Sequence, residues 1–367
     1  MTNRVLHIGV DGRELLGKTT GVGRYVAEVL RCWSRDATWP HRLSVFVPGP
    51  PPTRAELGPR VAWVIDAGSR SGTWWEQRRL PGLLRRAGVD VLFAPAYTAP
   101  ILRVCPSVLV VHDVSFFAHP EWFTARDGLR RRLLTRASAR RAARVLTVSE
   151  FSAGEIVRWL GIPRDRIALA APAGPEGPSS PAAPSGSAGP VILYVGSLFN
   201  RRRIPLLIDA FAILARQHPA ARLVLVGDNR TSPVVDPCQL AADRGLGGQV
   251  HWHAYVPDDV LAGLYGSATV FAFLSDYEGF GMPPMEALAH GVPPVLLDTP
   301  VSREIYGEAA SLVQDTPASV AAGLSALIED DGVRRARLAA GRALRSRFTW
   351  RRTADAIRDA LEGAAAP

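Results

Sequence analysis

The stretch SDYEGFGMPPMEALAHGVPPVLL, residues 275–297, places two glutamates on either side of a Gly-Phe-Gly turn. The apolar run Val270–Leu274 precedes it and predicts a buried strand. The turn therefore begins at the carboxyl end of a strand, which is where open α/β sheets bind ligands. Gly279 and Gly281 allow the backbone to turn and to approach a ligand closely.

A helix is predicted to follow this turn. Pro283 and Pro284 suit its first turn, and Gly291 ends it. Its free N–H groups and positive dipole end then point at the turn, which favours a bound phosphate. Glu278 lies just outside this seat and Glu286 about one turn inside the helix, so one carboxylate could hold a transferred sugar and the other a nucleotide ribose. The alternative is a solvated loop residue and an ordinary helix residue.

Short β-rich runs alternate with helical patterns along the whole chain, which predicts parallel sheets in an α/β fold. Helices are predicted over Pro205–His218 and Pro257–Ser267. The predicted strands are Val5–Val10, Leu43–Val47, Ala62–Ile65, Val89–Phe93, Ser107–Val111, Val145–Val148, Ile167–Ala171, Val191–Val195, Arg222–Val226, Val250–His253, Val270–Leu274 and Pro294–Leu297. Several are continuously apolar, as expected for strands covered on both faces.

A segment made almost entirely of Pro, Gly, Ala and Ser separates the two halves. Such a composition cannot build a core and is typical of a linker. A chain of 367 residues is also longer than a typical single domain, so we expect two doubly wound, Rossmann-like domains. The predicted parts are a first domain over residues 1–172, a linker over 173–190, a second domain over 191–347, and a C-terminal helix over 348–367 that packs back toward the first domain.

The composition limits the class of protein. A formal net charge of +9 favours anionic partners such as nucleotides, nucleic acid or an acidic membrane surface. We find no apolar run long enough to span a bilayer and no signal-peptide layout at the start of the sequence. The three cysteines are scattered and lack metal-ligand spacing, so we expect a cytoplasmic protein with reduced thiols.

A cluster of arginines follows the first predicted strand of the second half. That strand ends at Gly196, and Arg201, Arg202 and Arg203 come before the next predicted helix. An arginine cluster without context is more often a solvated face. Here its place at the carboxyl edge of a sheet favours an anion-binding loop.

The segment YEGFGMPPMEALAHGVPPV resembles the Glu-x7-Glu motif of the retaining family-4 glycosyltransferases of the GT-B fold. In that fold two Rossmann-like domains face each other across a cleft. Other segments are similar to the family's motifs in order and spacing, so the resemblance covers essentially the whole chain. They are TGVGRYVAEVL at 20–30, VVHDVSFFAHPEWF at 110–123, LTVSEFSAGEI at 146–156, LYVGSLFNRRRIPLLIDAF at 193–211, LVLVGDN at 223–229 and FTWRRTADAI at 348–357.

The resemblance implies a role for each site residue. His112 and Glu278 are expected to act at the donor sugar, with Asp113 in a supporting or acceptor-side role; a satisfied core histidine is the alternative for His112. The leaving diphosphate is expected to contact Arg201, Arg202, Gly196, Gly279, Phe280 and Gly281. The nucleotide ribose is expected at Glu286 and Gly227, and Gly21 and Gly23 are expected to line the cleft.

Four residues of the basic loop depart from the commoner form of the family motif. Arg202 occupies the position where the family usually has Lys. The compact ammonium group is thereby replaced by a planar guanidinium with several donors. Phe199, Asn200 and Arg203 replace the Glu-Pro and the Asn of that form.

The resemblance implies retaining transfer of a hexosyl or deoxyhexosyl group from a nucleotide-sugar to a glycan or lipid-linked glycan. We expect no cofactor beyond this co-substrate. We also expect no metal, because no Asp-x-Asp motif is placed to bind one and the adjacent Asp258 and Asp259 are interpreted as helix-capping residues. One alternative is a nucleotide-sugar epimerase of the same architecture. A nucleic-acid-binding protein is less favoured, because the arginines and aromatic residues form no recognised module.

Two segments of the first half suggest a membrane partner. Residues 126–144 hold eight arginines around Leu129, Leu133, Leu134 and Ala137, which are spaced as an apolar helical stripe. Residues 72–86 add two tryptophans beside arginines. Together they could dock on anionic lipid at the inner face of the plasma membrane. The alternative is a solvated helix face with buried tryptophans.

Overall fold

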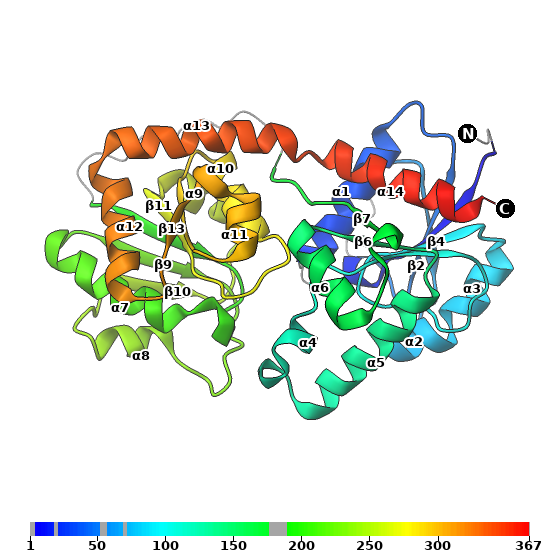
Figure 1. The fold of residues 1–367 in the computed structure, drawn as a ribbon, viewed down its shortest axis with the longest axis horizontal. Helices are drawn as coiled ribbons and strands as arrows, with labels where there is room; N and C mark the ends of the chain where they lie inside the picture. The colour runs from blue at the N-terminus through cyan, green and yellow to red at the C-terminus, as the bar shows by residue number, and fades with distance from the viewer. Residues whose placement is uncertain (1–3, 18–20, 52–56, 69–71, 176–188, 367) are drawn as a thin grey trace. The chain divides into compact units, whose positions relative to one another are not determined.

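The computed structural model describes residues 4–17, 21–51, 57–68, 72–175 and 189–366. The chain divides into two compact units, one formed by Met1–Pro172 with Thr349–Pro367 and one by Ala173–Phe348 (Figure 1). Residues 176–188, the central part of the predicted linker, lie outside the described residues.

The first unit contains a seven-stranded parallel sheet in the described residues, with the order β3-β2-β1-β4-β5-β6-β7. Its strands are β1 (His7–Asp11), β2 (Arg42–Val47), β3 (Val61–Ile65), β4 (Val91–Ala94), β5 (Ser107–Val110), β6 (Arg144–Thr147) and β7 (Ile167–Leu169). Its α-helices are α1 (Gly21–Arg35), α2 (Thr73–Arg78), α3 (Leu80–Ala87), α4 (Ser115–Ala118), α5 (Ala125–Arg141), α6 (Glu150–Leu160) and α14 (Trp350–Ala365). The strand order reverses between β1 and β4, which makes this the topological switch point of the sheet.

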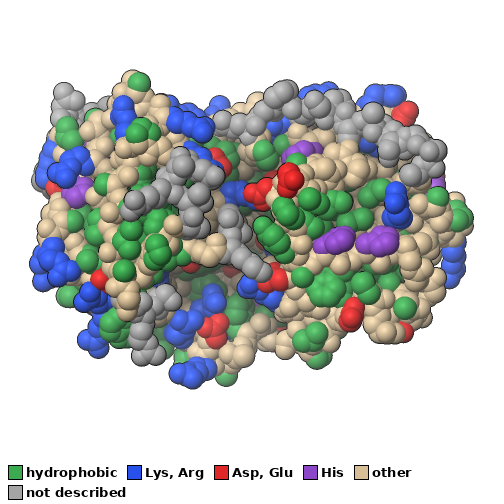
Figure 2. Space-filling model, turned by 180° about the vertical axis from the view of Figure 1, so that it is seen from behind, with side chains coloured by type: hydrophobic (Ala, Val, Ile, Leu, Met, Phe, Trp, Pro, Cys, Tyr) green, Lys and Arg blue, Asp and Glu red, His purple; other side chains and the backbone are tan. Residues whose placement is uncertain are grey.

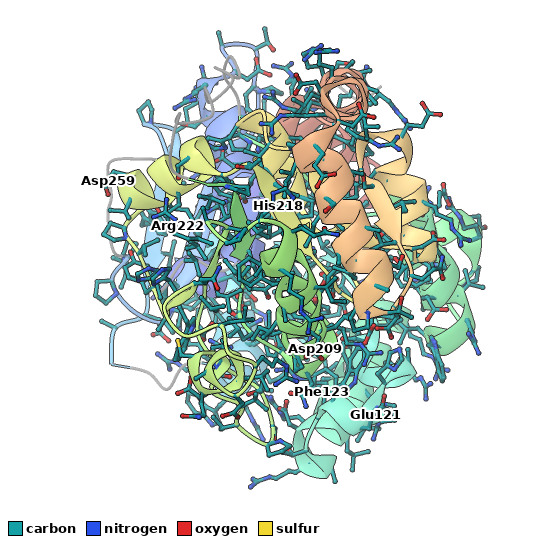
Figure 3. The ribbon with its side chains drawn as sticks, turned by 90° about the vertical axis from the view of Figure 1, so that its left-hand side faces the viewer. Glu121, Phe123, Asp209, His218, Arg222 and Asp259 are labelled. Atoms are coloured by element: carbon teal, nitrogen blue, oxygen red, sulfur yellow. The ribbon has the colours of Figure 1, made fainter. Side chains whose placement is uncertain are left out.

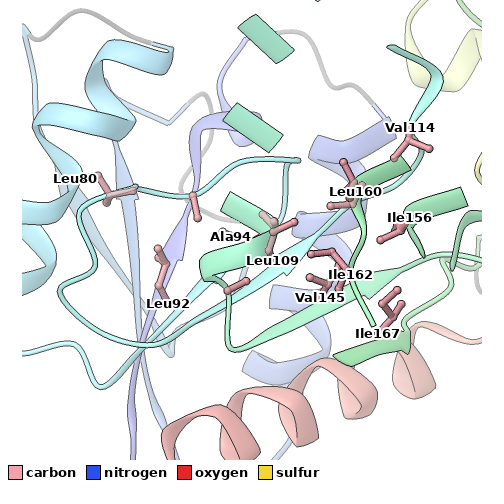
Figure 4. Packing of buried hydrophobic residues seen from close by; sticks show 14 of the residues in the cluster. Leu80, Leu92, Ala94, Leu109, Val114, Val145, Ile156, Leu160, Ile162 and Ile167 are labelled. Carbon is pink, nitrogen blue, oxygen red and sulfur yellow. The ribbon is translucent and has the colours of Figure 1, made fainter. Parts of the chain in front are cut away.

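The apolar strands of this unit form a continuous core with the helices beside them. Leu92, Leu109 and Val145 come from three neighbouring strands and are fully or almost fully buried. They belong to one cluster with Ile156 and Leu160 of α6 (Figure 4). Both faces of the sheet are covered, which explains why the sequences of these strands are continuously apolar.

The C-terminal helix α14 packs on α1 within the first unit, so the red end of the chain lies beside its blue start in Figure 1. The Trp33 indole N–H donates to the carbonyl oxygen of Ala354 at 3.1 Å. The ring of Trp350 meets that of Tyr25 edge-on at 6.0 Å. These contacts join two segments that lie more than 300 residues apart in sequence.

The second unit contains a six-stranded parallel sheet in the described residues, with the order β10-β9-β8-β11-β12-β13. Its strands are β8 (Val191–Val195), β9 (Arg222–Val226), β10 (Val250–His253), β11 (Val270–Phe273), β12 (Pro294–Leu297) and β13 (Ser311–Val313). Its α-helices are α7 (Ile204–Gln217), α8 (Pro237–Ala242), α9 (Asp258–Ser267), α10 (Met282–Ala289), α11 (Pro300–Ile305), α12 (Pro317–Glu329) and α13 (Asp331–Arg347). Here the switch point lies between β8 and β11.

The α/β prediction is confirmed. Every predicted strand overlaps an observed one, and the helices predicted over Pro205–His218 and Pro257–Ser267 correspond to α7 and α9 within a residue. The sequence did not predict β13. It is a three-residue edge strand with only one buried position, so it lacks the continuous apolar run of the inner strands.

The carboxyl ends of β8 and β9 approach so closely that one position requires glycine. Gly227 has φ +146°, and a Cβ atom there would lie 2.0 Å from the carbonyl oxygen of Gly196. The Gly196 N–H donates to the carbonyl oxygen of Val226 at 2.8 Å. This pairing directs the chain after β8 across the end of the sheet.

We predict that Gly227→Ala lowers the thermal unfolding midpoint by several degrees. The unfavourable φ alone should cost about 1–3 kcal/mol, and the clash with Gly196 adds to it. Gly154→Ala is the matched control, because Gly154 is an exposed helical residue of α6 with open space at its Cβ. That control should melt at or above the wild-type temperature. Circular dichroism measures the unfolding midpoints. Equal midpoints for the Gly227 variant and wild type would contradict this account of the turn.

Candidate active site

Two loops meet at the switch point of the second sheet. The loop after β8 carries Arg201 and Arg202 in a short 3-10 helix, and the loop after β11 carries Ser275–Gly281. The N–H of Asp276 donates to the carbonyl oxygen of Arg201 at 2.9 Å. Motifs that are more than 70 residues apart in sequence are thereby joined at one sheet edge.

Arg202 is the central cation of this site. Its Nη2 lies 2.9 Å from Glu278 Oε1, and its Cζ lies 4.3 Å from the ring centroid of Phe273. Its Nε and Nη1 are buried, and neither has a hydrogen-bond partner among the residues that the structure describes. Buried N–H groups are costly to leave unsatisfied, so these two donors are suited to a bound anion.

Glu278 is held by two donors on the same oxygen. The Ser275 hydroxyl donates to Oε1 at 2.7 Å, and Arg202 contacts that oxygen as well. The sequence analysis missed Ser275. Its position as the second residue after β11 could have identified it, because side chains at the carboxyl edge of a strand are the ones that meet ligands.

The Gly-Phe-Gly turn leads into α10 as predicted, but Phe280 faces away from solvent. Gly281 has φ +87° and is the N-cap of α10. The Tyr306 hydroxyl donates to the carbonyl oxygen of Gly281. The Phe280 ring is only 5% exposed and meets Phe348 edge-on at 5.2 Å. The side chain of Phe280 therefore has a packing role, and only its backbone is available for a predicted diphosphate contact.

Glu286 is buried one turn inside α10. The Tyr265 hydroxyl donates to its Oε2 at 3.2 Å. Burial raises the pKa of Tyr306 well above its ordinary value, and the nearby carboxylates of Glu286 and Glu278 add to the shift. Both predicted glutamates follow β11, Glu278 in the loop after the strand and Glu286 in α10.

In the first unit, His112 follows β5 at the carboxyl edge of the sheet. Its Nε2 lies 2.8 Å from the carbonyl oxygen of Pro95, which can only accept, so Nε2 carries the hydrogen. Burial lowers the pKa of His112. The ring of Tyr25 on α1 meets the imidazole edge-on at 5.1 Å. The imidazole is therefore favoured in its neutral form with a fixed tautomer.

Asp113 is oriented by a tyrosine that the sequence analysis missed. The Tyr97 hydroxyl donates to Asp113 Oδ2 at 2.8 Å, and the Ser115 N–H donates to Oδ1 at 2.8 Å. Tyr97 has φ +64°, an uncommon backbone conformation for a residue other than glycine. Such strain persists where surrounding contacts enforce it, and it is frequent at functional sites.

A buried polar cluster fixes the segment next to Tyr97. Arg13 Nη2 lies 2.8 Å from both Asp11 Oδ2 and Glu76 Oε1. The Thr98 hydroxyl donates to Glu76 Oε1 at 2.6 Å. Burial raises the pKa of Glu76, and the positive charge of Arg13 opposes this shift. No sequence signal marked Glu76 as buried, because it is a charged residue in a helix of only six residues.

The predicted cleft glycines begin α1. Gly21 is its first residue and Gly23 is buried. The same helix supplies Tyr25, so the first turn of α1 leads directly to the contact with His112. Within the described ranges, no group of three or more His, Cys, Asp or Glu side chains is arranged to hold a metal ion.

The sequence matches two known families. Residues 19–173 match the family described as Glycosyltransferase Family 4, and residues 180–344 match Glycosyl transferases group 1. The O-antigen chain mannosyltransferase B of Escherichia coli is 30% identical over 262 residues, which are 68% of each chain. The O-antigen chain mannosyltransferase RfbU of Salmonella typhimurium is 26% identical over 66% of this chain and 65% of its own.

The structure is similar to solved glycosyltransferase structures. Anabaena HepE, crystallised with UDP and glucose, has a TM-score of 0.74 at 17% identity, with 97% of this chain and 99% of that chain covered. The chain belongs to the family-4 glycosyltransferases of the GT-B fold.

We predict that His112 makes the fold sensitive to acid. Because its pKa is lowered in the folded state, the unfolded chain binds the proton first as the pH falls through about 6.5. The stability from the neutral imidazole is thus present above that pH and is lost below it. Thermal melts at pH 7.5 and 5.5 should show a smaller acid loss for His112→Gln than for wild type.

The exposed His251 of β10 provides the control for this comparison. His251→Gln should lose as much stability as wild type between the two pH values. An undiminished loss in the His112 variant would show that another group is responsible.

Proposed function

We propose that this chain is a retaining glycosyltransferase that moves a hexosyl or deoxyhexosyl group from a nucleotide-sugar to a hydroxyl of a glycan or lipid-linked glycan. The observation that carries the proposal is the pair of buried, unsatisfied donors, Nε and Nη1, of Arg202 beside Glu278. The mannosyltransferases of O-antigen chains and the HepE structure with UDP and glucose support this substrate class.

The donor diphosphate contacts Arg202 and Arg201 at the switch point of the second unit. The Nε and Nη1 groups of Arg202 lack a partner within the described residues, and each can donate a charge-assisted hydrogen bond to a phosphate oxygen. The amino-terminal end of α10 adds a positive dipole end beside the Gly279–Gly281 turn. Preorganised donors of this kind stabilise the negative charge that develops on the leaving group.

The two glutamates have separate roles in this proposal. Glu278 accepts hydrogen bonds from hydroxyls of the transferred sugar, because Ser275 and Arg202 fix one carboxylate oxygen and set the direction of the other. Glu286 holds the ribose, with Tyr265 orienting its carboxylate. In the family pattern, His112 acts at the donor sugar and Asp113 on the acceptor side.

The leaving group needs no metal in this account, because two arginines and a helix end supply the positive charge. The acceptor is bound by the first unit, again following the family resemblance. We further propose that this unit docks on an anionic membrane surface.

Arginine charge alone does not select a docking face, since Figure 2 shows arginine side chains spread over the visible face of both units. Helix α5 differs because it exposes apolar side chains as well. Leu129 and Leu133 lie one turn apart and are 52% and 60% exposed. Arg132 and Arg136 bond to backbone carbonyls of neighbouring segments and are not part of this surface.

The start of α2 extends the same surface. Trp74 is 46% exposed, whereas Trp75 is fully buried, so the predicted pair of tryptophans divides between surface and core. Arg130 Nη1 lies 2.7 Å from Thr73 Oγ1, which ties α5 to the residue beside Trp74. We define the α5 surface as Trp74, Arg126, Leu129, Arg130, Arg131, Leu133 and Arg140. In the described part of the chain, no helix has the length and apolar composition needed to cross a bilayer.

We predict that Arg202→Ala lowers kcat/KM about 10²–10³-fold, because a preorganised charge contact to the leaving group is lost. The assay measures acceptor-dependent release of nucleoside diphosphate with a panel of nucleotide-sugars, and NMR determines whether the product keeps the donor's anomeric configuration. Activity should survive EDTA. Arg244→Ala is the control, because Arg244 pairs with Asp209. Asp209 lies on α7 (Figure 3).

Three outcomes would contradict the proposal. Wild-type kinetics in the Arg202 variant would remove the diphosphate site. Donor consumption without an added acceptor would favour an epimerase. Complete loss of activity in EDTA that Mg²⁺ restores would exclude the metal-free account.

We predict that the protein co-sediments with vesicles containing anionic lipid and is released by high salt. Arg126→Glu with Arg130→Glu should weaken this binding at least about tenfold, since each arginine near the surface contributes about 1 kcal/mol. Activity on a soluble acceptor mimic should remain.

A matched charge reversal on α13, Arg335→Glu with Arg342→Glu, changes the net charge equally at two exposed positions of the second unit. This variant should bind vesicles like wild type. Equal loss in both double variants would indicate a non-specific charge effect, and binding to neutral vesicles at the same level would exclude the electrostatic surface.

A further inference from the structure

Phe199 lies beneath the guanidinium groups of two arginines. The Cζ of Arg201 is 4.4 Å from the centroid of its ring, and the Cζ of Arg230 is 6.0 Å from the same centroid. Both distances are within the range of cation–π attraction. Arg201 belongs to the proposed diphosphate site, whereas neither the sequence motif nor the proposed function used Phe199 or Arg230 as contacts.

The loop that carries Phe199 is fixed against the loop that carries Arg230. The N–H of Arg230 donates to the carbonyl oxygen of Leu198 at 2.9 Å. The Asn200 side chain forms a reciprocal pair with the backbone of Ser232, at 2.7 Å and 2.9 Å. The Nε of Arg230 also pairs with the carboxylate of Asp228. Because the two loops are bonded on both sides of Phe199 and Asp228 holds the guanidinium, the ring and the Arg230 side chain have a defined relative position.

An aromatic ring supports a guanidinium without using its hydrogen-bond donors. The ring contacts the face of the group, so the N–H edge stays available to an acceptor. Arg202 shows the same arrangement on Phe273, at 4.3 Å, and its Nε and Nη1 have no protein partner within the described residues. The commoner family motif has a glutamate at position 199. Its carboxylate would accept hydrogen bonds from a neighbouring arginine such as Arg201 and would compete with a phosphate for the same N–H groups.

We propose that Phe199 is a positioning residue that aims the guanidinium of Arg201 at the donor diphosphate and brings Arg230, whose Nε pairs with Asp228, to the same anion as a further hydrogen-bond donor. The inference rests on the proposed function, because it assumes that a diphosphate binds beside Arg202. It explains why Phe at position 199 accompanies an all-arginine loop in this chain. It also adds a residue from the loop after β9 to the donor site.

The test measures the affinity of inorganic pyrophosphate for the full-length protein by isothermal titration calorimetry. Phe199→Leu keeps an apolar side chain but removes the aromatic face, and it should weaken binding about 3- to 30-fold. Phe199→Tyr restores the face and should bind within about twofold of wild type. In the Arg201→Ala background, Phe199→Leu should cause a smaller loss than it does alone, because the cation that it positions is gone.

Phe123→Leu is the matched control, because the ring of Phe123 in the first unit also contacts an arginine. The Cζ of Arg131 lies 5.8 Å from its centroid. Figure 3 shows Phe123 near Glu121 on the segment that leads into α5. This variant should leave pyrophosphate affinity unchanged. Phe199→Met replaces Phe199→Leu if circular dichroism shows that the leucine variant does not fold.

The outcomes separate this inference from the proposed function. If Arg202→Ala binds pyrophosphate like wild type, the diphosphate site itself is wrong. If Arg202→Ala loses affinity and Phe199→Leu does not, the site stands and the role of Phe199 is overturned. An equal loss in Phe199→Tyr and Phe199→Leu would also overturn it, because the aromatic face would then not be the property that matters.

Discussion

The ion pair between Arg202 and Glu278 joins the two loops that leave the switch point of the second sheet. Both side chains are mostly buried, and a buried pair is stable only when its remaining donors and acceptors are satisfied. Ser275 satisfies one carboxylate oxygen and Phe273 supports the guanidinium face. The unsatisfied Nε and Nη1 donors of Arg202 are the part that the fold leaves for a ligand, and the proposed donor site rests on them.

The geometry of the sheet makes this pair possible. The order β10-β9-β8-β11-β12-β13 places the ends of β8 and β11 next to each other, although their loops are far apart in sequence. Gly227 lets the neighbouring strand end at Gly196 approach to a distance that a side chain at position 227 would not permit. The first unit repeats the principle, because residues beyond β4 and β5 bring Tyr97 and His112 to one sheet edge.

The fold and the charged motifs could be predicted from sequence because they depend on local signals. Strands buried on both faces read as apolar runs, and the residues that follow them mark the sheet edge. Glu76 and Tyr97 could not be found in this way, since their burial and backbone conformation depend on contacts with distant segments. Phe280 belongs to a motif that the sequence identified. The direction of its ring could not be predicted, because it depends on packing against Phe348.

The central claim is that the site in the second unit recognises a diphosphate. The most direct measurement compares the affinities of nucleoside diphosphates and their matching nucleosides for the wild-type protein, by calorimetry over guanosine, uridine, thymidine and adenosine pairs. The account predicts that the best diphosphate binds at least about tenfold more tightly than its nucleoside, since charge-assisted hydrogen bonds contribute about 1.5–3 kcal/mol each. Equal affinities for a diphosphate and its nucleoside would contradict it.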